Sequence, residues 1–205
     1  MNIRSLFGKR QRAYFDRRRE EKAWASAGFV APSPSHVKRT TLLRLGLPHA
    51  TWVETGTFRG DTTALLLKHG SFVYSIEPDL ELYQAAKRRF LDNDRVKILH
   101  GLSEEILPVL LPTIHGNVNF YLDGHYSGGI THQGPTDCPV LAELAAIASS
   151  MGNFKRVSLM IDDVRCFDPS KSGQQDYPSI DALVDWARQF GFQWHIEHDI
   201  FVAVL

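Results

Sequence analysis

Strand-like and helix-like segments alternate along the chain from about residue 50 to residue 190, and this alternation limits the fold more than any other feature. The predicted strands are short apolar runs at 51–55, 72–77, 95–100, 117–123 and 156–162. The predicted helices, with apolar residues at helical spacing, lie near 61–69, 80–91, 103–111, 137–150 and 179–190. Strands that alternate with helices pair in parallel through right-handed crossovers. The sequence therefore predicts an α/β protein with a doubly wound, mostly parallel sheet.

The last two apolar runs break this alternation. They cover residues 192–197 and 200–205, and only His198 and Asp199 separate them. A connection of two residues permits only antiparallel pairing, because a parallel crossover needs a much longer segment. We therefore expect seven strands in all, with the sheet ending in an antiparallel β-hairpin.

Length and composition exclude several classes of protein. A chain of 205 residues with 43% hydrophobic and 22% charged residues is typical of a single globular domain. Its net charge of zero gives no overall basic field, so we expect no nucleic-acid partner. Cys138 and Cys166 form neither a disulfide framework nor a metal-binding pattern, which favours a reducing cytoplasm. No apolar run is long enough to span a bilayer, and no signal-peptide core is found.

The charge is unevenly distributed along the chain. Residues 1–24 carry eight basic and three acidic side chains, a net charge of +5, which leaves −5 for the remainder. Apolar residues are interspersed among these charges, so the segment could lie on a membrane surface or a partner protein. The alternative is a solvated helical extension. We interpret residues 1–35 as a basic N-terminal arm with a proline-rich linker, and we leave homo-oligomerisation open.

The segment Glu54–Gly60 (ETGTFRG) follows the first predicted strand and precedes a helix. A P-loop is excluded, because the glycines are four apart and no lysine follows. A dinucleotide motif needs a glycine where Phe58 stands, so a diphosphate is also disfavoured. An acidic residue repels phosphate but suits a ligand that has an ammonium and a sulfonium centre, which describes S-adenosylmethionine. The alternative is an ordinary glycine-capped turn.

Three features in order resemble the class I S-adenosylmethionine-dependent methyltransferases over residues 50–205. They are the Glu54–Gly60 motif, the segment Ser75-Ile76-Glu77-Pro78 and the terminal hairpin. The resemblance implies that residues 36–205 form a methyltransferase domain, that the motif's glycines pass under the methionine part of the cofactor, and that Glu77 accepts both ribose hydroxyls. Glu77 could instead cap a helix, and Ser103 could be an N-cap. The cofactor-binding residues that we expect are Glu54, Gly56, Thr57, Gly60, Thr62, Glu77, Ser103 and Asp123.

Three aspartates follow the fourth and fifth predicted strands: Asp123, Asp162 and Asp163. The two strand ends belong to one edge of the sheet, and three converging carboxylates repel one another unless a cation or a proton intervenes. Oxygen ligands favour Mg²⁺, or Mn²⁺ in its place. The arrangement resembles metal-dependent sugar O-methyltransferases, although His125 stands where those enzymes tend to have another acidic residue. Alternatively the carboxylates bind the cofactor's ammonium, cap helices or pair with Arg165.

Candidate catalytic bases are Asp123 and two histidines, His125 and His132, in the glycine-rich segment HYSGGITHQG. A histidine near neutral pKa suits the deprotonation of a hydroxyl, and the glycines suggest a lid. His36 and Lys38 precede the first strand and either cover the site or lie on the surface.

The sequence thus predicts a methyltransferase that acts on a hydroxyl of a small molecule, such as a sugar or a glycan precursor. One rival is metal-independent O- or N-methylation of another metabolite. Another is a cofactor-binding protein without catalysis, which uses the basic arm to bind a partner.

Overall fold

The computed structural model of the protein describes residues 8–124, 138–171, 173 and 176–205. Within these residues, strands form a seven-stranded sheet in the order β3-β2-β1-β4-β5-β7-β6. The strands are β1 Thr51–Thr55, β2 Phe72–Glu77, β3 Val96–His100, β4 Gly116–Leu122, β5 Phe154–Ile161, β6 Gln193–Glu197 and β7 Ile200–Val204. Each begins and ends within two residues of its predicted bounds, so the sequence-based fold is confirmed.

Strand direction also follows the prediction. Strand β1 pairs in parallel with β2 and β4, and the parallel ladders continue from β2 to β3 and from β4 to β5. Strand β7 is antiparallel to both β5 and β6. His198 and Asp199 have φ values of 52° and 65°, as a tight hairpin turn with two left-handed residues requires.

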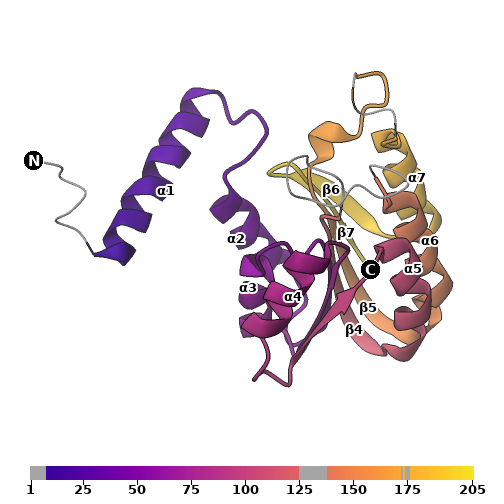
Figure 1. Ribbon diagram of the computed structural model, residues 1–205. Helices are drawn as coiled ribbons and strands as arrows, with labels where there is room; N and C mark the ends of the chain where they lie inside the picture. The colour runs from indigo at the N-terminus through magenta and orange to yellow at the C-terminus, as the bar shows by residue number, and fades with distance from the viewer. Residues whose placement is uncertain (1–7, 125–137, 172, 174–175) are drawn as a thin grey trace, which may run out of the picture.

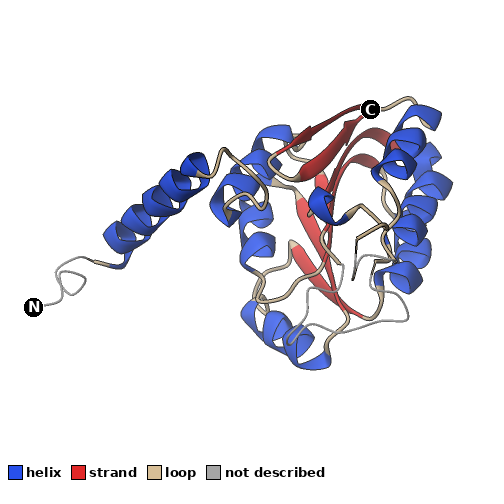
Figure 2. Cartoon of the chain, turned by 90° about the horizontal axis from the view of Figure 1, so that it is seen from above, coloured by secondary structure: helices blue, strands red, loops and turns tan. Residues whose placement is uncertain are grey.

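Helices cover both faces of the sheet (Figure 1). They are α1 Lys9–Ser26, α2 Ser35–Leu45, α3 Asp61–His69, α4 Leu80–Arg89, α5 Ser103–Leu110, α6 Val140–Ser150 and α7 Ile180–Gln189. Figure 2, which looks along another direction, shows the sheet between its two helical layers. Helices α2, α3 and α4 lie on one side, and α5, α6 and α7 lie on the other.

The hydrophobic core is divided by the sheet because successive side chains of a strand point to opposite faces. On β1, Trp52 belongs to the cluster that includes Leu42 of α2 and Leu66 of α3. Its neighbour Val53 belongs to the larger cluster beneath α5, α6 and α7. Each of these side chains is at most 1% exposed.

Helix α2 was not predicted, and it positions part of the site. Its end is bound to the sheet: Leu47 N donates to Asn119 Oδ1 on β4 (2.7 Å), and Asn119 Nδ2 donates to Leu47 O (3.0 Å). Ser158 Oγ of β5 donates to Leu45 O (2.9 Å). Leu42 is fully buried, and Lys38 lies one helical turn before it on the same face. Lys38 is therefore turned toward the sheet.

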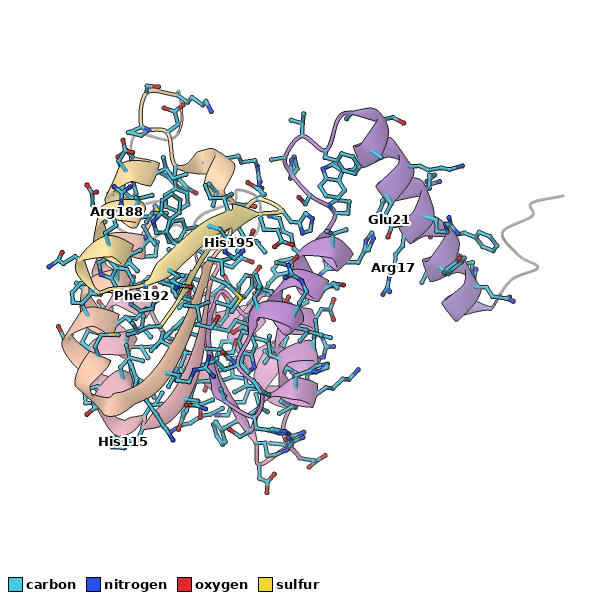
Figure 3. The ribbon with its side chains drawn as sticks, turned by 180° about the vertical axis from the view of Figure 1, so that it is seen from behind. Arg17, Glu21, His115, Arg188, Phe192 and His195 are labelled. Carbon is cyan, nitrogen blue, oxygen red and sulfur yellow. The ribbon has the colours of Figure 1, made fainter. Side chains whose placement is uncertain are left out.

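Helix α1 extends away from the body, as Figure 1 shows, and most of its described side chains are exposed. It contacts the body through its last turns, where the Trp24 ring packs edge-on against His198 (5.5 Å between centroids). His36 of α2 forms a hydrogen bond with Glu21 (2.9 Å), which Figure 3 labels on the side of α1 that faces the body. Among the described helices, none is long and apolar enough to cross a membrane.

Candidate functional site

A cavity of about 1030 Å³ lies at the carboxyl ends of β1, β4 and β5. Its wall combines the turn after β1 with polar side chains that follow β4 and β5, and the end of α1 and the start of α2 border it. Residues from each part of the wall include Trp24, Lys38, Gly56, Tyr121, Asp123 and Asp162. In doubly wound sheets, ligands bind at this edge.

Gly56 opens the turn after β1 in a left-handed conformation, with φ of 88°. A Cβ atom at this position would lie 2.4 Å from the carbonyl oxygen of Asp123. The missing side chain therefore allows the end of β1 to pass closely against the backbone that follows β4. The structure thus explains the glycine by its contact with the Asp123 backbone. Contact between Gly56 and a cofactor stays a prediction.

The rest of the turn leads into helix α3. Gly60, with φ of 75°, is the residue before the helix, and a Cβ there would lie 2.8 Å from the Phe90 ring. Phe58 has φ of 49° and is 42% exposed at the cavity wall. Asp61 and Thr62, in the first turn of α3, line the cavity as well. The amide groups of a first helical turn have no partner within the helix, so they can bind an anionic group.

Glu54 is fully buried, which differs from its expected place beside a ligand's ammonium. Thr63 Oγ1 and Ser75 Oγ both donate to its Oε2 atom, each at 2.5 Å, and these bonds link α3 to β2. Burial raises the pKa of Glu54 to about 7, and nearby Glu77 adds to the increase while the two hydroxyls oppose it. Among the described residues, no group forms a hydrogen bond with its Oε1 atom. Glu54 thus helps to hold the turn.

Glu77, at the end of β2, is buried and holds the same turn from the other side. Its Oε2 accepts a hydrogen bond from Phe58 N (2.6 Å), and its Oε1 accepts one from Asp79 N (3.0 Å). A carboxylate oxygen can accept a second bond, so these contacts are compatible with the predicted ribose diol. That role stays a prediction.

Ser103 is the first residue of α5 and is buried, but Leu102 is the N-cap, so the N-cap alternative for Ser103 is wrong.

Tyr121 brings two of the predicted aspartates together. Its hydroxyl lies 2.7 Å from Asp162 Oδ2 and 3.2 Å from Asp123 Oδ2, and it can donate to either. Burial raises the pKa of Tyr121 well above its ordinary value, and the charges of Asp123 and Asp162 raise it further. Tyr121 therefore remains a protonated donor between β4 and β5, and the expected convergence of the strand ends is confirmed.

Lys38, which the sequence analysis placed either over the site or on the surface, lies in the cavity wall and contacts the predicted aspartates. Its Nζ atom lies 2.5 Å from Asp162 Oδ1, 2.5 Å from Asp163 Oδ1 and 3.4 Å from Asp199 Oδ2. Arg165 also forms ion pairs with Asp163 and Asp199. Burial alone would lower the pKa of Lys38, but the ion pairs with Asp162 and Asp163 outweigh it and raise that pKa. The lysine is therefore charged at neutral pH.

The prediction of Mg²⁺ or Mn²⁺ at Asp123, Asp162 and Asp163 is not supported. The position between Asp162 and Asp163 is taken by the Lys38 ammonium, whose distances leave no room for an ion that needs oxygen ligands at about 2.1 Å in octahedral geometry. No group of three or more His, Cys, Asp or Glu residues in the described part of the chain is arranged to hold a metal ion. The aspartates converge as predicted, but their cation is a side chain.

Other site predictions have mixed outcomes. His125 and His132, the two predicted histidine bases, lie outside the described residues. Arg39, which the sequence analysis did not consider, lines the cavity next to Lys38. Its Nε atom is buried and has no hydrogen-bond partner among the described residues. A guanidinium group in the cavity wall with one donor unused among the described residues suits an anionic ligand group.

Together the sheet order, the terminal hairpin and the cavity at the carboxyl edge define a Rossmann-like methyltransferase fold. No family model matches the sequence, and no curated protein matches it in sequence either. The chain is similar in structure to the O-methyltransferase from Bacillus cereus in complex with SAH, with a TM-score of 0.55 and 14% identity over 91% of this chain and 88% of that one. It is also similar to a SAM-dependent methyltransferase from Aquifex aeolicus, with a TM-score of 0.53 and 17% identity over 84% and 94% of the chains.

Proposed function

We propose that this protein is an S-adenosylmethionine-dependent methyltransferase that acts on a hydroxyl of a small molecule, such as a sugar or a glycan precursor. The observation that carries the proposal is the cavity itself. It places the turn Gly56–Gly60 and the Tyr121–Asp123 pair in one wall, at the edge of the sheet where doubly wound folds bind their ligands. The likeness to an O-methyltransferase that was crystallised with SAH favours the same chemistry.

The described residues fit the methionine end of this cofactor. Asp61 and Thr62 at the start of α3 line the cavity, and so does Arg39; the backbone amides of a first helical turn and a guanidinium group both suit a carboxylate. The cavity volume of about 1030 Å³ has room for a cofactor and an acceptor together. When bound, the cofactor would supply an activated methyl group on a sulfonium.

The protein's own contribution would be to align the acceptor and to take its proton. The protein would hold the acceptor hydroxyl in line with the methyl group that the cofactor supplies, and the hydroxyl proton would pass to a base of the protein. Among the described residues, Asp123 is the candidate base, and the Tyr121 hydroxyl orients its carboxylate. His125 and His132 remain candidates for the same task. Trp24 in the wall offers an amphipathic ring surface to a sugar.

The rival functions make different predictions. A metal-independent N- or O-methyltransferase of another metabolite would bind the cofactor and turn over a different acceptor. A non-catalytic protein that uses the basic arm of residues 1–24 to contact a membrane or a partner would bind the cofactor and transfer nothing.

Calorimetric titration with S-adenosylmethionine, SAH and NAD⁺ tests the proposal. We expect the first two to bind and to compete for one site. We expect no heat from NAD⁺, because Phe58 stands where a diphosphate needs glycine. Absence of binding by both S-adenosylmethionine and SAH would overturn the proposal. If both bind, methyl transfer from labelled cofactor to a panel of sugars and sugar nucleotides then separates the enzyme from the non-catalytic binder.

A further inference from the structure

Three carboxylates surround one ammonium group beside the cavity. Asp162 and Asp163 follow β5, and Asp199 lies in the β6–β7 turn, yet all three approach Nζ of Lys38 within 3.4 Å. The Lys38 side chain is 10% exposed, and those of Asp162, Asp163 and Asp199 are 7%, 16% and 1% exposed. Buried carboxylates at such distances repel strongly unless a cation compensates them.

The geometry suits an ammonium group in particular. An ammonium has three N–H donors, and three carboxylate oxygens lie around Nζ, two of them at 2.5 Å. Lys38 reaches this position because α2 is fixed to β4 and β5 by Asn119 and Ser158. Arg165 compensates Asp163 and Asp199 from its own side. Within this group, two cationic side chains therefore face three carboxylates.

The group is also part of the cavity wall. Lys38, Asp162, Asp163 and Arg165 line the same cavity as the turn at Gly56. Asp162 shares one oxygen with Lys38 and the other with the hydroxyl of Tyr121, which in turn reaches Asp123. Three contacts, Lys38–Asp162, Tyr121–Asp162 and Tyr121–Asp123, thus connect Lys38 to the candidate base.

We propose that Lys38 is the resident cation of this acceptor site: its ammonium takes the position of a divalent metal ion, fixes Asp162 and Asp163, and makes the protein independent of added metal. Lys38 is a positioning residue in this scheme, because it acts on Asp123 through Asp162 and Tyr121. The expected effect of Lys38 on turnover rests on the proposed function. The expected effect of Lys38 on metal binding does not.

The scheme has a consequence that a purely structural lysine would not have. Removal of the ammonium leaves Asp162, Asp163 and Asp199 close together, with Arg165 still paired to Asp163 and Asp199. Such a set of oxygen ligands favours a hard divalent ion. The Lys38→Ala protein should therefore acquire a metal site that the natural protein lacks, and Lys38→Arg, which keeps the charge, should not.

The test compares the natural protein, Lys38→Ala, Lys38→Met, Lys38→Arg and the control Lys68→Ala, whose lysine is exposed on α3. Each is titrated with Mn²⁺ by electron paramagnetic resonance and with Tb³⁺ by luminescence, for which Trp24 in the cavity wall and Tyr121 serve as sensitisers. Melting temperatures are measured in chelator and in Mg²⁺. We expect binding, and a rise in melting temperature of about 5 °C, only for Lys38→Ala and Lys38→Met.

Two results would overturn the inference. One is stoichiometric Mn²⁺ binding by the natural protein, a measurement that does not depend on the folding of any variant. The other is a folded Lys38→Ala or Lys38→Met protein, shown by circular dichroism, that binds neither ion. Cofactor affinity is measured on the same samples. If the natural protein does not bind the cofactor, the proposed function is wrong, and the metal titrations alone then test the role of Lys38. Turnover that survives chelator in the natural protein, and that divalent ions partly restore in Lys38→Ala, would add support.

Discussion

Acidic side chains gather at two places along the same edge of the sheet, and their partners differ. At the ends of β1 and β2, Glu54 and Glu77 are buried among hydroxyl and backbone N–H donors. At the ends of β4 and β5, Asp162 and Asp163 pair with the charged groups of Lys38 and Arg165 and line the cavity. Hydrogen bonds from hydroxyl and backbone N–H groups to the first pair fix a turn, whereas the second pair belongs to an ion-pair network that lines the cavity.

The difference shows that a carboxylate at a functional edge is not automatically a ligand-binding group. Burial raises the pKa of Glu54 to about 7, although the hydroxyls of Thr63 and Ser75 that donate to it oppose the increase. Asp162 and Asp163 instead pair with charged side chains and line the cavity. Gly56 joins the two places, because its missing side chain lets the end of β1 lie against the backbone of Asp123.

The largest effect should come from Gly56→Ala. The new Cβ would lie 2.4 Å from a backbone oxygen in a residue with φ of 88°, so both contact and conformation are unfavourable. We expect the free energy of unfolding to fall by about 4 kcal/mol in urea titrations. The matched control is Gly152→Ala, where a Cβ meets nothing within 4 Å and little change is expected. Equal stability of the two variants would show that the β1 and β4 ends are not in close contact.

The next effect concerns pH and Glu54. Because its pKa rises from 4.5 to about 7 on folding, the folded state holds the proton more tightly than the unfolded state. The associated stability is complete below pH 4.5 and is lost as the pH rises to about 7, a change of about 3 kcal/mol. Unfolding free energies of the natural protein and Glu54→Gln should therefore diverge across this range, whereas Glu81→Gln, at an exposed position on α4, should follow the natural protein. Parallel pH profiles for the natural protein and Glu54→Gln would rule out the assigned pKa.

Asp162→Asn should have an intermediate effect. It removes one of the carboxylates that compensate Lys38 and alters the partner of Tyr121, while Asp163 and Asp199 remain. We expect a loss of about 2 kcal/mol in unfolding free energy. Asp185→Asn, which breaks a longer and exposed ion pair with Arg188, should change stability little. Equal unfolding free energies of Asp162→Asn and Asp185→Asn would mean that the ion pairs around Lys38 do not stabilise the protein.

The smallest expected effect is on ligand binding rather than stability. Arg39→Gln removes the guanidinium group of a residue that lines the cavity and whose Nε atom has no hydrogen-bond partner among the described residues. Loss of a charge-assisted bond to the cofactor's carboxylate should weaken its binding about tenfold in calorimetry. Arg44→Gln, on the same helix but outside the cavity, should bind as the natural protein does. Identical cofactor affinities of Arg39→Gln and the natural protein would show that the cofactor's carboxylate does not bind Arg39.

Much of this fold could be predicted from the sequence because its determinants are local. Apolar periodicity located the seven strands, and the two residues His198 and Asp199 determined the direction of the last pair. Helix α2 was missed, because its residues 35–45 follow a proline-rich segment and carry a mixed polar pattern. Its helical state is supported by bonds from Asn119 and Ser158, which are distant in sequence.

The candidate site was predictable to a smaller extent, because part of it depends on residues that are distant in sequence. The topology places Asp123 and Asp162 at one edge, so their convergence follows from strand order alone. The identity of the cation does not, because Lys38 and Asp162 are 124 positions apart and no local pattern links them. The prediction of magnesium failed at this step: it inferred correctly that the carboxylates need a positive charge, and it assigned that charge to an ion.

The most direct test of this account is a crystal structure of the natural protein grown with SAH and Mn²⁺ and measured at the manganese absorption edge. We expect SAH in the cavity, with its methionine carboxylate at the start of α3 near Arg39. We also expect that Nζ of Lys38 stays between Asp162 and Asp163, with no anomalous peak there. A manganese peak between these carboxylates with Lys38 displaced, or SAH bound away from the turn at Gly56, would contradict it.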